Sequence, residues 1–135
     1  MASRRRTFGT EVAFWELCLR PRGGRKKRVR ARVGKPYKIS PREWACPVEV
    51  RGFESRYPDI RGVDSMQALC LATSLIRMRL EDVLSKGGTI QDIDEESEYD
   101  LRSVRAAFGA TPPRTPHNRA LQRTALARRR GTRDR

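Results

Sequence analysis

The residues best suited to chemistry in this sequence are three arginines at alternate positions, Arg28, Arg30 and Arg32. On a β-strand, alternate side chains point the same way and repeat about every 6.6 Å, close to the spacing of adjacent phosphates in a nucleic acid. Four further cations precede them in the chain: Arg22, Arg25, Lys26 and Lys27. This pattern predicts a basic strand face that binds RNA, DNA or another anionic partner.

Two further observations bear on this hypothesis. Phe14 lies in the apolar segment just upstream, where its ring could stack on a base between the guanidinium groups. A solvated strand face is the alternative interpretation, because charged side chains also protect exposed strands from aggregation. The sequence carries no zinc-finger, RNA-recognition or helix-turn-helix pattern, so it does not indicate a sequence-specific reader.

The residue types that usually carry catalysis or bind metals are sparse. The only histidine, His117, is far in the sequence from Cys18, Cys46 and Cys70, and the cysteines are widely spaced. This arrangement favours neither a Cys–His hydrolase nor a zinc site, and no glycine-rich loop is suited to cradle a phosphate. We therefore expect a non-catalytic protein with no cofactor and no metal, whose cysteines are free thiols in a reducing cytoplasm.

The charge of the chain is +14, and it is concentrated at the two ends. Residues 1–42 contain fourteen Lys and Arg against two Glu, whereas residues 91–105 are acidic and residues 106–135 are basic again. Such asymmetry suggests an anionic partner but carries no information on the fold. The apolar stretch after Arg5 and Arg6 is too short and too broken for a secretion signal, and no segment reaches the length of a membrane span.

A single long helix organises the rest of the sequence, and we predict it over residues 64–86. Asp64 and Gln67 form a capping-box pattern at its start, and Gly87 and Gly88 follow its end. Its apolar residues fall in one stripe, which needs a partner surface such as a sheet. The stripe consists of Leu69, Ala72, Ile76, Leu80 and Val83, with Ala68 and Leu75 at its edge.

The strands expected around this helix begin with a hairpin formed by residues 11–19 and 28–33. If Leu17 lies opposite Val29, Glu16 meets Arg30 on the outer face, and this pairing supports the register. Residues 43–53 form the third candidate strand, in which Pro47 favours an edge position or a bulge. Residues 55–61 and 89–93 are candidates for two further short strands.

These elements predict an α+β fold with a three- to four-stranded antiparallel sheet and one main amphipathic helix packed on one face. We expect a basic lead-in at residues 1–7, the domain at residues 8–95, and an acidic-then-basic tail at residues 96–135 that is largely disordered. Within the tail, residues 100–108 are a candidate for a short helix.

The helix also presents a second candidate surface, because Leu71 and Met78 project away from the core stripe. An exposed apolar strip of this kind predicts a contact with a protein partner or a weak homodimer. The alternative is that tail residues cover the strip, namely Leu101, Val104 and Phe108. Arg79 lies at the edge of the core stripe, where we expect it to pair with Glu49 or Asp59.

Three motifs together resemble a small uncharacterised bacterial domain family over residues 10–90. They are Gly34-Lys35-Pro36, Trp44-x-Cys46-Pro47 and Gly62-Val63-Asp64-x-x-Gln67-Ala68-Leu69-x-Leu71-Ala72. The resemblance implies a compact antiparallel sheet of three or four strands with one main helix, and it implies no activity or catalytic residue. The leading function hypothesis is thus a binding module for an anionic partner. Its rival is a protein-interaction or immunity-type module that acts through the outer helix face.

Overall fold

The predicted hairpin forms in the expected register. In the computed structural model, which describes residues 7–94 and 97–109, β1 (Glu11–Arg20) pairs antiparallel with β2 (Lys27–Gly34). Leu17 lies opposite Val29, and Glu16 lies opposite Arg30. Strict alternation in β2 explains this result, because only one register buries its small apolar residues and leaves the arginines on the other face.

The α+β class is confirmed, and the strands divide between two antiparallel sheets. The larger sheet has the order β5-β2-β1-β7-β8, and the smaller one has the order β3-β4-β6. The remaining strands are β3 (Tyr37–Ser40), β4 (Glu43–Cys46), β5 (Val48–Arg51), β6 (Ile60–Gly62), β7 (Thr89–Asp92) and β8 (Glu98–Tyr99). The expected single sheet of three or four strands is therefore replaced by a five-stranded and a three-stranded sheet.

Pro47 is the point at which the chain passes from one sheet to the other. The segment expected as a single strand at residues 43–53 ends in β4 at Cys46 and resumes in β5 at Val48. Proline has no N–H for a strand ladder, but its carbonyl accepts a hydrogen bond of 2.9 Å from the N–H of Gly34. The expected edge position is found for β5, which is an edge strand of the larger sheet.

The long helix α1 (Ser65–Ser85) begins and ends at the predicted caps. Asp64 accepts a hydrogen bond from the N–H of Gln67 (2.7 Å), and the Gln67 side chain accepts one from the N–H of Val63 (2.8 Å). Gly87 stops the helix with a φ of 87°, a conformation that glycine adopts without strain. Five residues of the predicted stripe and its edge are buried, namely Ala68, Ala72, Ile76, Leu80 and Val83, whereas Leu69 and Leu75 are only partly buried.

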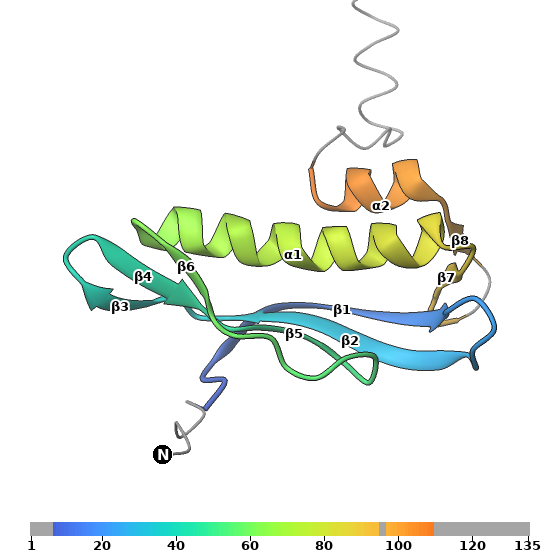
Figure 1. Cartoon of the computed structure of the whole chain (residues 1–135), viewed down its shortest axis with the longest axis horizontal. Coiled ribbons are helices and arrows are strands. Elements are labelled where there is room, and N and C mark those ends of the chain that lie inside the picture. Colours follow the sequence, from blue (N-terminus) through green and yellow to red (C-terminus); the bar gives the residue numbers. More distant parts are fainter. Residues whose placement is uncertain (1–6, 95–96, 110–135) are drawn as a thin grey trace, which may run out of the picture.

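The described fold extends beyond residue 95. After β8, the short helix α2 (Leu101–Ala107) packs on α1 and places Val104 fully in the core. Figure 1 shows α1 lying across the sheet and α2 resting on the other side of α1. The predictions for the lead-in at residues 1–6 and for disorder at residues 110–135 lie outside the described residues.

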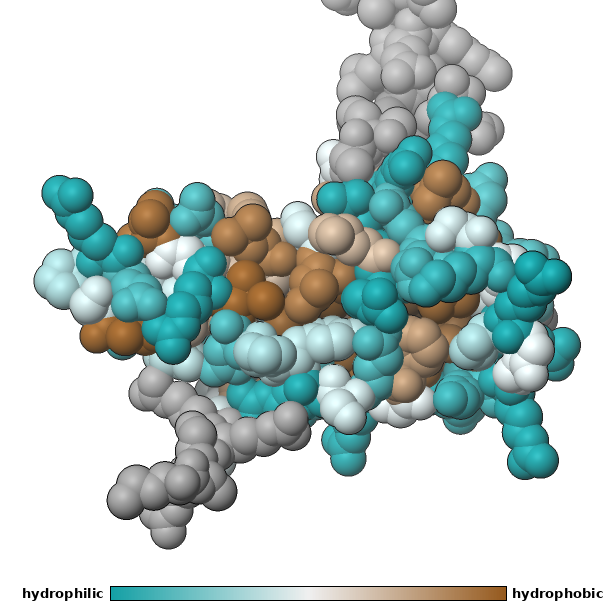
Figure 2. Space-filling model, viewed as in Figure 1, coloured by the Kyte–Doolittle hydropathy of each residue, from teal (hydrophilic) through white to brown (hydrophobic). Residues whose placement is uncertain are grey.

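The elements form an elongated layer structure with distinct ends. The turn of the β1–β2 hairpin lies at one end, close to the last turn of α1, and the β3–β4 hairpin lies at the other (Figure 1). The core lies between α1 and the larger sheet, where Leu17, Val48 and Leu80 are fully buried. On the face seen in Figure 2, apolar residues gather along α1 and below it, and hydrophilic residues dominate the hairpin-tip end.

Candidate nucleic-acid interface

The three alternating arginines lie on the face of β2 that points away from α1. Val29, Ala31 and Val33 are buried on the helix side, so the pleat directs the arginines to the opposite side. Arg28 is exposed, whereas Arg30 and Arg32 are half-buried. The structure thus brings the three residues onto one face, as the sequence predicted, but gives them different surroundings.

Arg30 and Arg32 are held by glutamates from the two neighbouring strands. Arg30 donates hydrogen bonds to Glu11 and, at 2.6 Å, to Glu16 on β1. Arg32 donates from Nε to Glu49 on β5 at 2.6 Å and from Nη1 to Glu11 at 3.2 Å. Three carboxylates therefore neutralise two guanidinium groups, and Arg30 and Arg32 form an ion-pair network with Glu11, Glu16 and Glu49, here called the glutamate network.

Glu11 is the centre of this network, because it accepts hydrogen bonds from both arginines. The hydrogen bond from Arg30 is the main reason why the pKa of Glu11 lies below its ordinary value of 4.5. The hydrogen bond to Glu11 in turn raises the pKa of Arg30. Both side chains are therefore charged across the neutral pH range, and each is the hydrogen-bond partner of the other.

The aromatic rings near the network are occupied as well. The guanidinium carbon of Arg30 lies 3.6 Å from the ring centroid of Phe14, and that of Arg32 lies 3.8 Å from the centroid of Phe8. These are cation–π contacts. Phe14 is nevertheless 56 % exposed.

The hairpin tip is different, because five of its cations have no carboxylate partner among the described residues. Residues 17–42 contain no Asp or Glu. Five exposed side chains of this segment form no ion pair with any residue in the described part of the chain; they are Arg20, Arg22, Arg25, Lys27 and Arg28, here called the tip cluster. Lys26 lies among them and is exposed too. The basic patch predicted from sequence is therefore divided into a neutralised part and a charged tip.

The turn that carries the tip cluster is well defined. The N–H of Gly24 donates to the carbonyl of Pro21 at 3.0 Å, and Gly23 has a φ of 72°, which allows the tight turn. Arg22 packs beside Gly87 at the C-terminal end of α1, where the helix dipole favours a cation. Sequence reasoning omitted Arg20 from the basic patch, although the absence of acidic residues around it was a usable signal.

The helix strip formed by Leu71 and Met78 is not covered by the described residues. The two side chains are 44 % and 57 % exposed. Of the tail residues considered as a cover, Val104 is buried against the core, and Phe108 packs on Trp15 with ring centroids 5.9 Å apart. Leu101 lies beside Met78 at a shallow depression but leaves it open.

Arg79 pairs with acidic residues other than those predicted. Its Nε donates to Glu54 at 2.7 Å, and its Nη1 lies 3.5 Å from Asp82. The expected partners are already engaged, because Glu49 binds Arg32 and Asp59 binds Arg56. The prediction of Glu49 or Asp59 was wrong because the loop after β5, which carries Glu54, could not be positioned from the sequence.

The three cysteines are free thiols in different environments. Cys18 and Cys46 are buried, and Cys70 is exposed on α1. The Cys46 thiol donates to the carbonyl of Gly34, and burial raises its pKa to about 11, so it is protonated near neutral pH.

Within residues 7–94 and 97–109, no three His, Cys, Asp or Glu side chains are grouped as metal ligands. No helix in this part of the chain is long and apolar enough to cross a membrane.

The chain belongs to the family described as Domain of unknown function (DUF6968), whose model matches residues 16–102. This range begins within β1, contains the hairpin tip and α1, and ends within α2. The resemblance to an uncharacterised domain family is thereby confirmed. A search of curated proteins and a search of solved structures each found no match.

Proposed function

We propose that this member of the DUF6968 family is a non-catalytic binding module that engages the phosphate backbone of a nucleic acid through the tip cluster. The observation that carries the proposal is the concentration of five exposed cations, at residues 20–28, without a carboxylate partner in the described residues. Each cation that neutralises a phosphate releases a bound counterion, and this release drives association.

The glutamate network has a supporting role in this proposal. Its net charge is negative, so it does not attract phosphates, and it holds β2 against β1 and β5 through charged hydrogen bonds. The base of the hairpin is thus tied to the sheet, while the charged tip projects at the end of the molecule (Figure 1). A two-stranded ribbon of this kind fits the width of the DNA major groove.

The proposed binding is directed at the backbone and not at a particular sequence. Arginine and lysine at the tip supply charge, and the aromatic ring of Phe14 is already in contact with Arg30. Backbone contacts position a protein on nucleic acid but do not read bases. We therefore expect similar affinities for unrelated sequences of the same length and strand number.

Fluorescence anisotropy of labelled duplex DNA and single-stranded RNA with the full chain tests this function. We expect affinity to fall by orders of magnitude between about 50 and 200 mM salt, as it does when several phosphates are contacted. Affinity that stays constant over this range would refute phosphate-driven binding.

The exposure of Leu71 and Met78 supports a second candidate function, a protein-interaction or immunity-type module that acts through the outer helix face. Size-exclusion chromatography with light scattering distinguishes self-association through this strip. A mass that depends on concentration, and that returns to the monomer value in Leu71→Asp and Met78→Asp variants, supports it.

We also propose that the protein resides in a reducing cytoplasm, because all three of its thiols are free.

A further inference from the structure

The N-terminal half of β1 has a backbone edge without a strand partner. On one side, β1 pairs with β2 over nearly its whole length. On the other side, the strands of the described chain pair with it only at residues 17–20, through β7. The edge is therefore open over residues 11–16, where alternate N–H and C=O groups point away from β2. This edge carries no lysine or proline, the residues that commonly protect such strands.

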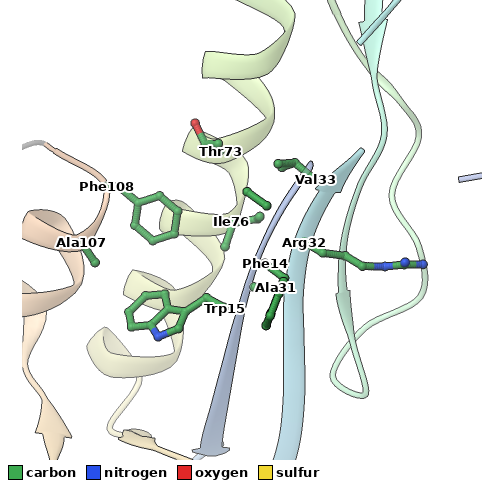
Figure 3. A pocket seen from close by; sticks show the side chains of 10 residues that line it. Phe14, Trp15, Ala31, Arg32, Val33, Thr73, Ile76, Ala107 and Phe108 are labelled. Carbon is green, nitrogen blue, oxygen red and sulfur yellow. The ribbon is translucent and has the colours of Figure 1, made fainter. Parts of the chain in front are cut away.

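An apolar groove of about 520 Å³ lies beside this open edge. Ala13 and Trp15 of β1 line it from the sheet, Thr73 and Ile76 line it from α1, and Phe108 closes one end. In Figure 3 the rings of Trp15 and Phe108 lie near each other at this end, whereas the Arg32 side chain extends away from the helix. The groove is thus a stretch of core-facing sheet surface that neither helix fills.

The charged groups around the groove are paired among themselves. Arg32 belongs to the groove lining and binds Glu11 and Glu49, and Glu11 and Glu16 bind Arg30 on the far face of the sheet. A charged side chain placed in the groove would lose its hydration and find no free partner there. The part of a bound partner that contacts the groove must therefore be uncharged to match the apolar lining.

We propose that the open edge of β1 binds an extended peptide segment of another protein as an added strand. The segment would lie in line with β7, hydrogen-bond to residues 11–16, and direct alternate apolar side chains into the groove. This is the β-augmentation mode, in which the backbone supplies affinity and the groove supplies selectivity.

A second copy of this chain fits the site less well than a separate peptide does. Antiparallel pairing of two β1 edges about Ala13 brings the small Ala13 side chain of the other copy to the groove. The Trp15 of that copy already packs on its own Tyr99, with ring centroids 5.2 Å apart. Bulky side chains at alternate positions are needed to fill about 520 Å³, and a heterologous peptide can supply them.

Selection from a phage-displayed library of random nine-residue peptides, with the full chain as target, tests this inference. We expect enriched peptides to carry uncharged apolar residues at alternate positions. Each selected peptide is then synthesised in two forms, N-methylated at either the odd or the even backbone amides. Because only alternate amides of an added strand face β1, one form should lose binding at least tenfold and the other should retain it.

Substitutions on α1 supply the matched controls. Thr73→Trp fills the groove and should weaken peptide binding at least tenfold, whereas Ser74→Trp places the same ring on the neighbouring position outside the groove lining and should not. Ala13→Lys, which puts a charge on the groove floor, provides an independent test that does not alter α1. Circular dichroism establishes that each variant folds.

Five results would overturn the proposal. Four of them are a library without enrichment of alternating apolar peptides, equal binding by both N-methylated forms, equal effects of Thr73→Trp and Ser74→Trp, and a peptide-free dimer that Thr73→Trp dissociates. Such a dimer would assign the edge to a second copy. Slow hydrogen exchange at every amide of residues 11–16 in the peptide-free protein would show that the edge is already paired, and would also contradict the proposal.

Discussion

Glu16 and Arg30 lie directly opposite each other across the β1–β2 ladder, and the guanidinium of Arg30 donates a 2.6 Å hydrogen bond to the Glu16 carboxylate. Arg30 also donates to Glu11, and Arg32 donates to Glu49, so neither arginine is available to a partner. The arginine triplet that first suggests nucleic-acid binding is therefore split. The available charge lies at the tip of the hairpin, and the following predictions depend on this division.

Removing the glutamates should release Arg30 for phosphate binding. We predict that the Glu11→Gln, Glu16→Gln double variant binds duplex DNA more tightly than the wild type. Its plot of log affinity against log salt should be steeper by about one, because one cation is added. Asp64→Asn with Asp100→Asn changes the net charge equally at two helix N-caps, where asparagine also caps and no ion pair with a described cation is lost, so it should leave the slope nearly unchanged. Equal slopes for the two double variants would contradict the network's masking role.

The glutamate network should also make the fold sensitive to acid. The pKa of Glu11 is lowered in the folded protein, mainly by the hydrogen bond from Arg30, so its carboxylate stabilises the fold above the unfolded pKa near 4.5. That contribution is lost as the pH falls from 4.5 through the lower, folded value. We predict that Glu11→Gln is less stable than the wild type at neutral pH and loses less stability in acid. Urea unfolding followed by tryptophan fluorescence measures the free energy of unfolding of both proteins at each pH. If the two free energies fall in parallel as the pH is lowered, Glu11 is not the source of the acid sensitivity.

One thiol in three should react rapidly in the folded protein. Cys70 is exposed, whereas Cys18 is buried and Cys46 is buried with a pKa of about 11, which keeps it protonated. We predict that a disulfide reagent such as DTNB modifies one thiol per chain at about pH 8 and all three after denaturation. Cys70→Ser should abolish the rapid reaction, and rapid modification of a second thiol would contradict the described burial.

Gly62 should tolerate no side chain, because β6 approaches the first turn of α1 there. A Cβ atom at this position would lie 2.5 Å from the backbone nitrogen of Ala68. We predict that Gly62→Ala lowers the free energy of unfolding by about 1–3 kcal/mol, as overpacking of a core does. Gly24→Ala, whose Cβ atom would have ordinary contacts of 3.4 Å, is the control and should change stability little. Similar effects of both substitutions would be inconsistent with this close approach.

The sequence predicts the local features of this fold well. Alternating residues in β2 determine the register with β1, and Asp64 and Gly87 mark the ends of α1 because caps depend on neighbouring residues. The division of residues 43–53 at Pro47 was not predicted, since a sheet crossover depends on which strands lie alongside. The strand β3 was not predicted, because Pro36 and Pro41 flank it and proline is typical of loops.

The candidate site was only partly predictable for the same reason. Alternation placed the three arginines on one face, and the hairpin register placed Glu16 beside Arg30. The pairing of Arg32 with Glu49 joins residues far apart in the sequence and required the position of β5. The open edge of β1 also emerged only from the topology, because it depends on where β7 stops pairing.

The most direct test of the proposed function compares two charge-matched variants of the full chain by fluorescence anisotropy. In the tip variant, Arg22, Arg25, Lys27 and Arg28 are changed to Gln. In the control variant, the same change is made at four exposed cations elsewhere, Lys35, Lys38, Arg42 and Arg102. Both variants lose the same charge, so a difference between them reports the location of binding and not net charge.

We predict that the tip variant loses most of its affinity for duplex DNA at about 50 mM salt, and that its log–log salt slope falls by about 3 to 4, whereas the control variant stays close to the wild type. Equal losses in the two variants would contradict the tip as the binding site and would reduce the interaction to the overall charge of the chain.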